Sequence, residues 1–267
     1  MKKIKFIKMD PPGTILNKKA LRHIVSRFIK DKSTKNFLDI GCGEGTYSEV
    51  LLRLGLQGVG IDFSEKSLDV AKENLVEYTS SQKYSTICGD FTKTSFDKKF
   101  DVIISWMVLE HVEDDTAFIQ NMEKLLNDGG VIISAVPARM KFWGIEDDLV
   151  GHYRRYEKKD LIEKISLSNI NLKELSIYSI CFPICNILLK ISNYLVEKGQ
   201  KETKKNLSML EKTKLSGYND LKFKTVFPPV FALILNERVF AIFDLIQRVF
   251  FRFDLGITYI FTAKKGD

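Results

Sequence analysis

A glycine-rich turn between a strand and a helix is the feature that most restricts what this chain can fold into. The run Asn36 to Ile40 is short and apolar, and Gly41-Cys42-Gly43-Glu44-Gly45 follows it directly. Apolar residues then recur at helical spacing from Tyr47 to Leu54. Glycine allows positive φ and lets a ligand approach the main chain where any other residue would present a Cβ. The segment therefore predicts a strand, a ligand-binding turn and a helix.

The alternation of strands and helices continues along the chain. Ser64 is placed to cap the helix that follows the second predicted strand. A later helix, from Phe118 to Leu126, is expected to stop at Gly129-Gly130. Further strands are predicted at Gln57 to Asp62, Tyr84 to Cys88, Phe100 to Ser105 and Val131 to Val136. This order predicts a mostly parallel sheet with helices on both faces and ligands at the carboxyl ends of the strands.

After Tyr156 the pattern changes. Leu172 to Ile180 and Ile257 to Ala263 can be strands, and residues 181–255 between them have a different character. We expect residues 1–180 and 256–267 to form one domain and residues 181–255 a helical cap or insertion. Its first helix is expected near Pro183, and its last helix, around Glu237 to Phe250, has a wide apolar face. That face fits a cap packed on the sheet. The alternatives are a lipid tunnel, a membrane-surface platform and a dimer contact.

An acid at the end of the second predicted strand points to the kind of ligand. Asp62 lies about 20 residues after Gly41, where a carboxylate can accept hydrogen bonds from both ribose hydroxyls. The spacing Gly-x-Gly-x-Gly departs from the dinucleotide fingerprint, because Thr46 stands where a third glycine would fall. An acid at Asp39 is awkward beside a diphosphate and suits an ammonium and a sulfonium. These features favour S-adenosylmethionine over NAD.

Four motifs between Phe37 and Pro137 carry a family resemblance. They are Leu38 to Gly45, Gly60-Ile61-Asp62, Gly89-Asp90-Phe91 and Leu109-Glu110-His111-Val112. Together they resemble class I S-adenosylmethionine-dependent methyltransferases, particularly the small-molecule type 11 or ubiquinone-biosynthesis-like group. The resemblance implies an α/β fold: a Rossmann-like, doubly wound, mostly parallel seven-stranded sheet, here with a helical insertion before the last strand.

The resemblance also implies roles for individual residues. Gly41 to Gly45 are expected to line the methionine and ribose, and Asp62 to bind the ribose. Asp90 is expected to accept a hydrogen bond from the adenine amino group, while Ser105 and Trp106 flank the methionine. The expected cofactor-binding set is Asp39, Gly41, Cys42, Gly43, Gly45, Asp62, Phe63, Asp90, Phe91, Ser105 and Trp106.

Methyl transfer from a sulfonium is an in-line displacement, so the protein chiefly aligns the reactants and excludes water. A general base is needed only when the acceptor loses a proton. His152 is the first candidate base, because a neutral imidazole suits proton removal near pH 7. His111 and Tyr153 are further candidates. The plainer alternatives are that His111 supports the donor site and that His152 packs among aromatic residues in a surface loop.

The segment Pro137 to Tyr156 is expected to overhang the ligand site. Its Phe-Trp-Gly, acidic and His-x-Arg-Arg-Tyr elements are similar to a pattern in bacterial members of the group. Arg154 and Arg155 can recognise a carboxylate or phosphate on the acceptor, or form structural ion pairs. The expected acceptor-binding residues are Arg139, Phe142, Trp143, His152, Arg154, Arg155 and Tyr156. We expect O-methylation of a small, hydrophobic or lipid-linked acceptor, with a non-catalytic membrane-associated scaffold as the alternative.

Composition and charge bear on partners and location. The net charge is +7 and the lysines are scattered, which fits a solvated basic surface or, alternatively, contact with an anionic membrane. Asp10-Pro11-Pro12-Gly13 lacks the aromatic residue of base-methylating enzymes, so no nucleic-acid partner is expected. The four cysteines show neither metal spacing nor a disulfide scaffold. We therefore expect no metal and a cytoplasmic monomer or homodimer, peripheral on the inner membrane face if residues 181–255 contact lipid.

Overall fold

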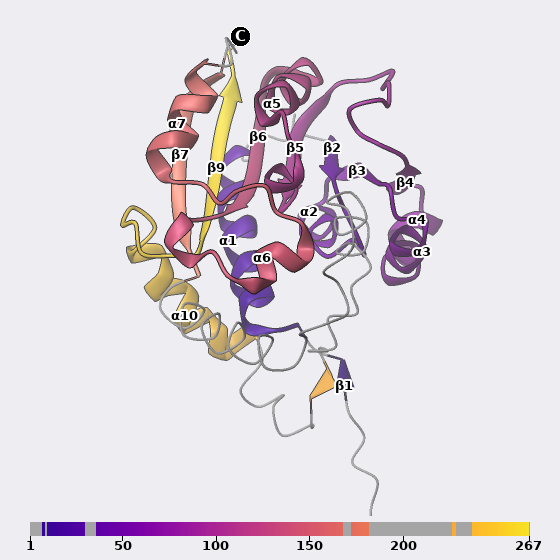
Figure 1. The fold of residues 1–267 in the computed structure, drawn as a ribbon. Coiled ribbons are helices and arrows are strands. Elements are labelled where there is room, and N and C mark those ends of the chain that lie inside the picture. The colour runs from indigo at the N-terminus through magenta and orange to yellow at the C-terminus, as the bar shows by residue number, and fades with distance from the viewer. Residues whose placement is uncertain are drawn as a thin grey trace, which may run out of the picture.

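The computed structural model of the protein describes residues 7–8, 10–29, 36–167, 172–181, 226–227 and 237–266. Its centre is a seven-stranded sheet in the order β4-β3-β2-β5-β6-β9-β7 (Figure 1). Strands β4 to β6 in that order are parallel, and β9 is antiparallel to both β6 and β7. The strands are β2 (Asn36–Ile40), β3 (Gln57–Asp62), β4 (Tyr84–Cys88), β5 (Phe100–Trp106), β6 (Leu126–Pro137), β7 (Leu172–Ile180) and β9 (Thr258–Lys265). The predicted fold class is confirmed.

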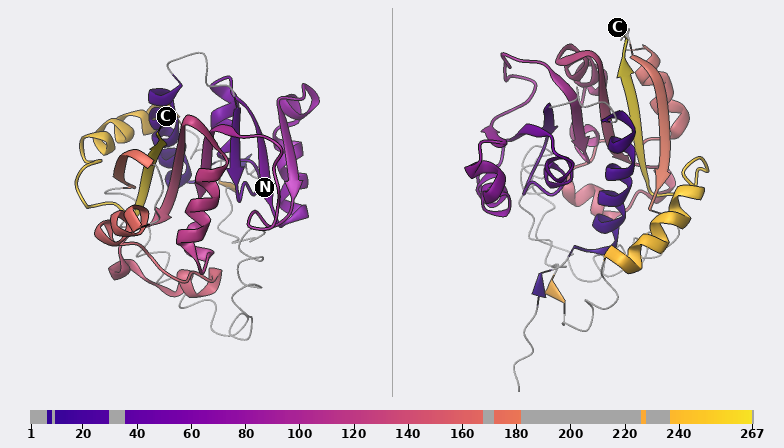
Figure 2. Two further views of the ribbon diagram at one scale, coloured as in Figure 1. Left: turned by 90° about the horizontal axis from the view of Figure 1, so that it is seen from above. Right: turned by 180° about the vertical axis from the view of Figure 1, so that it is seen from behind.

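Helices cover both faces of the sheet (Figure 2). On one face lie α1 (Pro12–Phe28), α2 (Ser48–Arg53) and α10 (Glu237–Val249), and on the other α5 (Asp115–Lys124) and α7 (Lys158–Leu167). Alternate residues of one strand therefore enter different cores: Val102 and Ile104 of β5 face α1, and Ile103 faces α5. A strand buried on both faces is apolar throughout, which explains the continuous apolar runs in the sequence.

The smaller elements complete the chain. A separate antiparallel pair joins β1 (Ile7–Lys8) to β8 (Val226–Phe227). The remaining helices and 3-10 turns are α3 (Glu65–Asn74), α4 (Val76–Ser80), α6 (Ile145–Val150), η1 (Leu109–His111) and η2 (Met140–Phe142).

Several predicted boundaries agree with the structure, but the end of α5 and the start of β6, predicted at Val131 and observed at Leu126, do not. Ser64 caps α3, since its hydroxyl oxygen accepts from the Ser67 amide at 3.2 Å. The helix predicted to stop at Gly129-Gly130 instead ends at Lys124. Leu126 already pairs with Phe100 in the sheet, and a bulge follows before the regular pairing resumes. Tertiary pairing of Leu126 therefore overrides the helical spacing of the segment.

The sequence interpretation missed α1. This helix begins at two prolines, a position where proline is well tolerated because the first amides need no helical acceptor. Its apolar side chains pack against α2, α10 and the sheet. The buried residues Ile15, Leu16, Ala20, Leu21, Ile24 and Val25 recur at helical spacing, so the signal was present in the sequence.

Of the expected insertion, the structure describes β8 and α10. The helix predicted near Pro183 lies outside the described residues, and the proposed domain division stays a prediction. No helix in the described part of the chain is long and apolar enough to cross a membrane. On α10, apolar side chains point to solvent: Leu245 and Val249 are 65% and 67% exposed.

Candidate active site

The glycine turn after β2 adopts the backbone that its sequence predicts. Gly41, Gly43 and Gly45 have φ of +69°, +50° and +79°, a region that other residues enter only at a cost. A Cβ at Gly41 would overlap the Val108 side chain, and one at Gly45 would lie 2.7 Å from Leu75 Cδ1. Among the described residues, no atom lies within 4 Å of the position that a Cβ at Gly43 would take. The main chain at Gly43 thus faces open space, where a ligand can approach.

Asp62, the acid at the end of β3, holds this turn. The Gly43 amide donates to Asp62 Oδ2 at 3.0 Å, and the Ser64 amide donates to Oδ1 at 2.8 Å. Burial raises the pKa of Asp62 above its ordinary value, and the amide hydrogen bonds oppose that shift. Each carboxylate oxygen retains a further lone pair. Asp62 can therefore fix the turn and still accept from a ligand hydroxyl.

Asp39 and Cys42 lie beneath the turn rather than on its surface. Asp39 is 1% exposed and accepts from the Ser48 hydroxyl at 2.6 Å. Ser48 Oγ also lies 3.0 Å from the Tyr84 hydroxyl. Cys42 is buried, and its sulfur would lie 2.6 Å from a Cβ at Gly60. Asp39 is thus shielded from direct contact with solvent, and its influence on a ligand is chiefly electrostatic.

The expected adenine contacts follow β3 and β4. Asp90 accepts from the Thr92 amide at 2.9 Å and from its hydroxyl at 2.7 Å, and these bonds hold the pKa of Asp90 below its ordinary value. The Phe91 ring is buried and packs edge-on against Phe118. Phe63 is 45% exposed beside the end of β3. Asp90 therefore organises its own turn, and Phe63 is the aromatic side chain of the set that is open to solvent.

The end of β5 supplies two buried side chains. Trp106 stacks on Tyr47 with ring centroids 4.4 Å apart, which joins β5 to the start of α2. Within the described part of the chain, neither Ser105 Oγ nor Trp106 Nε1 has a hydrogen-bond partner. Met107 then takes φ of +56° and turns the chain toward η1. An unsatisfied indole N–H at the strand end is a polar group that a ligand or water can satisfy.

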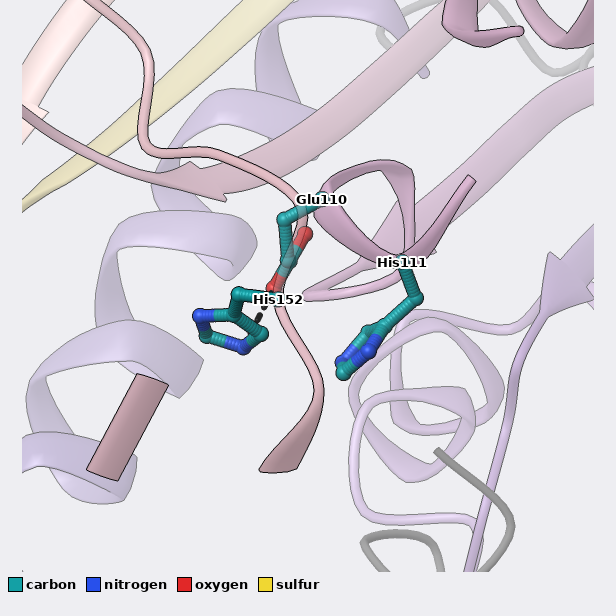
Figure 3. A group of neighbouring side chains, drawn as sticks. All are labelled: Glu110, His111 and His152. Carbon is teal, nitrogen blue, oxygen red and sulfur yellow. Dashed lines mark ion pairs between the residues drawn. The ribbon is translucent and has the colours of Figure 1, made fainter. Parts of the chain in front are cut away.

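A carboxylate and two imidazoles come together beyond β5. Glu110 and His111 come from η1 and His152 from the loop after α6, as Figure 3 shows. His152 Nε2 lies 3.7 Å from Glu110 Oε1, and the two imidazole rings meet edge to face at 4.7 Å. His152 Nδ1 lies 2.7 Å from Asp147 Oδ1. The sequence interpretation placed both histidines near the site but missed the two acids beside His152.

Burial sets the charges in this cluster. Glu110 is 0% exposed, and among the described residues neither of its carboxylate oxygens has a hydrogen-bond partner. Burial raises the pKa of Glu110 to about 7 and lowers that of His111 to about 4. His111 is thus neutral at pH 7. Ligand atoms of Glu110, His111 and His152 lie within 4.8 Å of one another, a grouping that can hold a metal ion although none was expected.

The arginines expected to bind the acceptor have partners within the chain. Arg139 donates to the carbonyl oxygens of residues 254–256 at 2.6 to 2.7 Å. Arg154 Nη1 lies 2.6 Å from Asp115 Oδ2, and Arg155 Nε lies 2.9 Å from Asp147 Oδ1. Of the two roles left open for Arg154 and Arg155, structural ion pairing is what these contacts supply.

The aromatic residues of the same segment differ in burial and in their contacts. The Tyr156 hydroxyl is buried, 3.0 Å from Asp115 Oδ2 and 3.2 Å from the Leu109 carbonyl. Phe142 lies under the Arg139 guanidinium, and Trp143 Nε1 donates to Asp148 at 3.2 Å. Tyr153 is 42% exposed. Residues 138–156, here named the clamp loop, are therefore tied to η1 and α5 through Arg154 and Tyr156, two of the residues expected to bind the acceptor.

A family model described as a methyltransferase domain matches residues 16–174. The chain belongs to this family. The match extends from within α1 to the first residues of β7 and so contains the glycine turn, Asp62, the Glu110 cluster and the clamp loop. The resemblance found in the motifs is confirmed.

Individual relatives agree with the family. The chain is 38% identical to a ubiquinone biosynthesis O-methyltransferase from Pelagibacter ubique over 140 residues, 47% of this chain and 58% of the relative. The chain spans about half the length of the curated relatives it matches. A Haemonchus contortus phosphoethanolamine N-methyltransferase 2 structure with S-adenosylhomocysteine has a TM-score of 0.56 at 17% identity, covering 93% of this chain and 52% of that one. A putative methyltransferase from Bacillus halodurans has a TM-score of 0.53 at 16% identity, covering 92% and 99%. These two structures share the fold.

Proposed function

We propose that this protein uses S-adenosylmethionine to methylate an oxygen of a small, hydrophobic or lipid-linked acceptor. The observation that carries the proposal is the turn at Gly43, whose main chain faces open space while Asp62 holds its amide. The family assignment and the O-methyltransferase names of the curated relatives support it. Bound at this turn, the donor supplies an electrophilic methyl group. Asp62 binds the ribose, and Phe63 and Asp90 border the adenine.

Donor binding can be tested without knowing the acceptor. Asp62→Ala removes a charged acceptor of hydrogen bonds, which costs about 1.5 to 3 kcal/mol, or roughly tenfold to 150-fold in affinity. Isothermal titration calorimetry with S-adenosylmethionine measures the change. Asp97→Ala, at an exposed position beyond β4, is the control and keeps wild-type affinity. Unchanged affinity in Asp62→Ala would place the donor elsewhere.

For proton removal from an acceptor hydroxyl, we propose His152. Asp147 lies 2.7 Å from Nδ1, so a neutral ring that donates from Nδ1 carries its lone pair on Nε2. The 3.7 Å between Nε2 and Glu110 is longer than a hydrogen bond, so Nε2 can accept the acceptor's proton. Glu110 then faces the imidazolium that forms. Neutral His111 packs against the ring and limits its rotation.

The acceptor test uses membrane lipid and quinone extracts, because the relatives' names point to ubiquinone biosynthesis. With methyl-labelled donor, label should enter the organic phase and one acceptor should gain the mass of one methyl group. His152→Gln should lower that rate by roughly 10² to 10⁴-fold and leave donor affinity unchanged. If turnover survives in His152→Gln, another group removes the proton. If no extract is labelled while the donor binds, the non-catalytic alternative gains support.

We also propose that α10 contacts a membrane surface. Ile242, Leu245 and Val249 are each more than 60% exposed, and Phe253 follows them at 57%. An amphipathic helix with such a face can lie in the lipid interface, particularly on a basic protein. In flotation with phosphatidylglycerol vesicles, the wild type should rise with the vesicles. The double variant Leu245→Asp, Val249→Asp should stay in the unbound fraction. If that variant instead turns a dimer into a monomer, the face is a contact between two copies.

A further inference from the structure

The buried carboxyl of Asp39 is unusual for a charged group. It is 1% exposed, two residues before the first glycine of the turn, and the Ser48 hydroxyl donates a hydrogen bond to it at 2.6 Å. In the described part of the chain no lysine, arginine or histidine forms an ion pair with it. An isolated buried carboxylate is costly, and such groups bind a proton instead.

The groups that face Asp39 from neighbouring elements add no positive charge. They are Ser48 of α2 and Tyr47 directly before it, Tyr84 of β4, Cys42 of the turn and Asp62 of β3. Burial raises the pKa of the Cys42 thiol and of the Tyr84 hydroxyl, so both stay neutral near pH 7. Burial raises the pKa of Asp39 to about 7, and the Asp62 charge adds to the shift. The ligand-free site therefore holds a proton that a nearby cation can displace.

We propose that Asp39 holds a proton in a large fraction of ligand-free molecules at neutral pH and releases it to solvent when a sulfonium-bearing donor binds, so that Asp39 discriminates the charged donor from its neutral thioether product. The inference rests on the proposed function. The bond that breaks is the carboxyl O–H, the proton goes to buffer, and the carboxylate left behind faces the donor's positive charge. S-adenosylmethionine and S-adenosylhomocysteine carry the same ammonium and carboxylate groups and differ by the charge on sulfur. A difference in proton release between them therefore reports the sulfonium.

Calorimetry in two buffers of different ionisation enthalpy counts the protons. At pH 7, S-adenosylmethionine should release about half a proton per molecule bound, because a group with a pKa near 7 is half protonated there. S-adenosylhomocysteine should release much less. The preference for donor over product should rise with pH, by at most about tenfold per unit below pH 7, and level off above it.

Two variants separate the effect of Asp39 from other groups. Asp39→Asn can still accept from Ser48, and it should abolish the difference in proton release while donor affinity falls toward that of the product. Ser48→Ala removes the hydroxyl that stabilises the carboxylate, so the pH of half-maximal release should rise. If Asp39→Asn does not fold, the proposal is still tested by comparing the numbers of protons that the wild type releases on binding S-adenosylmethionine and S-adenosylhomocysteine.

The possible failures differ. If neither ligand binds, the proposed function fails. If both bind and release equal numbers of protons, or if Asp39→Asn retains the wild-type difference, the proposed function stands and the role of Asp39 is overturned.

Discussion

Glu110→Gln tests whether the carboxyl at the centre of the histidine cluster is destabilising at neutral pH. Burial of Glu110 raises its pKa from the ordinary 4.5 to about 7, and neither carboxylate oxygen finds a hydrogen-bond donor among the described residues. Because the folded-state pKa is the higher one, stability from this residue is complete below pH 4.5. It is lost as the pH rises toward 7, since the unfolded chain ionises first.

The size of the effect follows from these two pKa values. Each unit of difference corresponds to about 1.4 kcal/mol, so between pH 5 and pH 8 the wild type should lose roughly 2 to 3 kcal/mol. Glutamine has nearly the same shape and does not titrate, so Glu110→Gln lacks this loss. Asp39 also has a raised pKa, but it is present in both proteins and its contribution cancels in the comparison.

Urea unfolding of both proteins at pH 5 and pH 8 provides the measurement. The free energy of unfolding should fall by roughly 2 to 3 kcal/mol more in the wild type than in Glu110→Gln between these pH values. Any constant effect of the amide on packing appears at both pH values and is removed by the double difference. Parallel pH dependences in the two proteins would show that Glu110 has an ordinary pKa and that the clamp loop leaves it solvated.

Three further substitutions test other contacts. Gly41→Ala places a Cβ on the Val108 side chain at positive φ, so it should destabilise the protein by at least about 1 to 2 kcal/mol in thermal unfolding and weaken donor binding in calorimetry. Asp115→Ala removes the carboxylate that Arg154, Lys164 and the buried Tyr156 hydroxyl share, so urea unfolding should show a loss of about 3 to 5 kcal/mol. The lowered pKa of Asp115 means that its contribution is present at neutral pH and disappears as the pH falls below 3.8, which the same unfolding experiment at pH 3 checks. Arg139→Ala removes the donor for three carbonyl groups at residues 254–256 and should cost about 1 to 3 kcal/mol, measured as a lowered unfolding midpoint.

The parts of the fold that could be predicted are those encoded by local pattern. Strands β2, β3 and β4 are short runs that end at a glycine or an aspartate, and their observed limits are the expected ones. The glycine turn was equally readable, because positive φ depends on the residue type itself. In contrast, the end of α5 depends on Leu126 pairing with Phe100, a contact between distant residues that helical spacing does not contain.

The acceptor side of the candidate site was harder to predict for the same reason. Arginine in a loop has the same sequence signal whether it binds a ligand or a distant acid. Arg154 pairs with Asp115, 39 residues earlier in the chain, and nothing in the spacing marks those two as partners. The Asp147 and His152 pair is only five residues apart, but the short helix α6 and the αL glycine at Gly151 are what bring the two side chains together.

The position of β9 in the sheet affects both folding during synthesis and the design of truncated fragments. Among the described strands β7 pairs only with β9, and β9 separates it from β6. During synthesis β7 therefore cannot pair until β9 has been translated, and until then β6 has an unpaired edge. A fragment ending at residue 174 would keep every signature motif of a methyltransferase and still expose that edge to other chains. A fragment whose limits are chosen from these motifs alone should therefore aggregate.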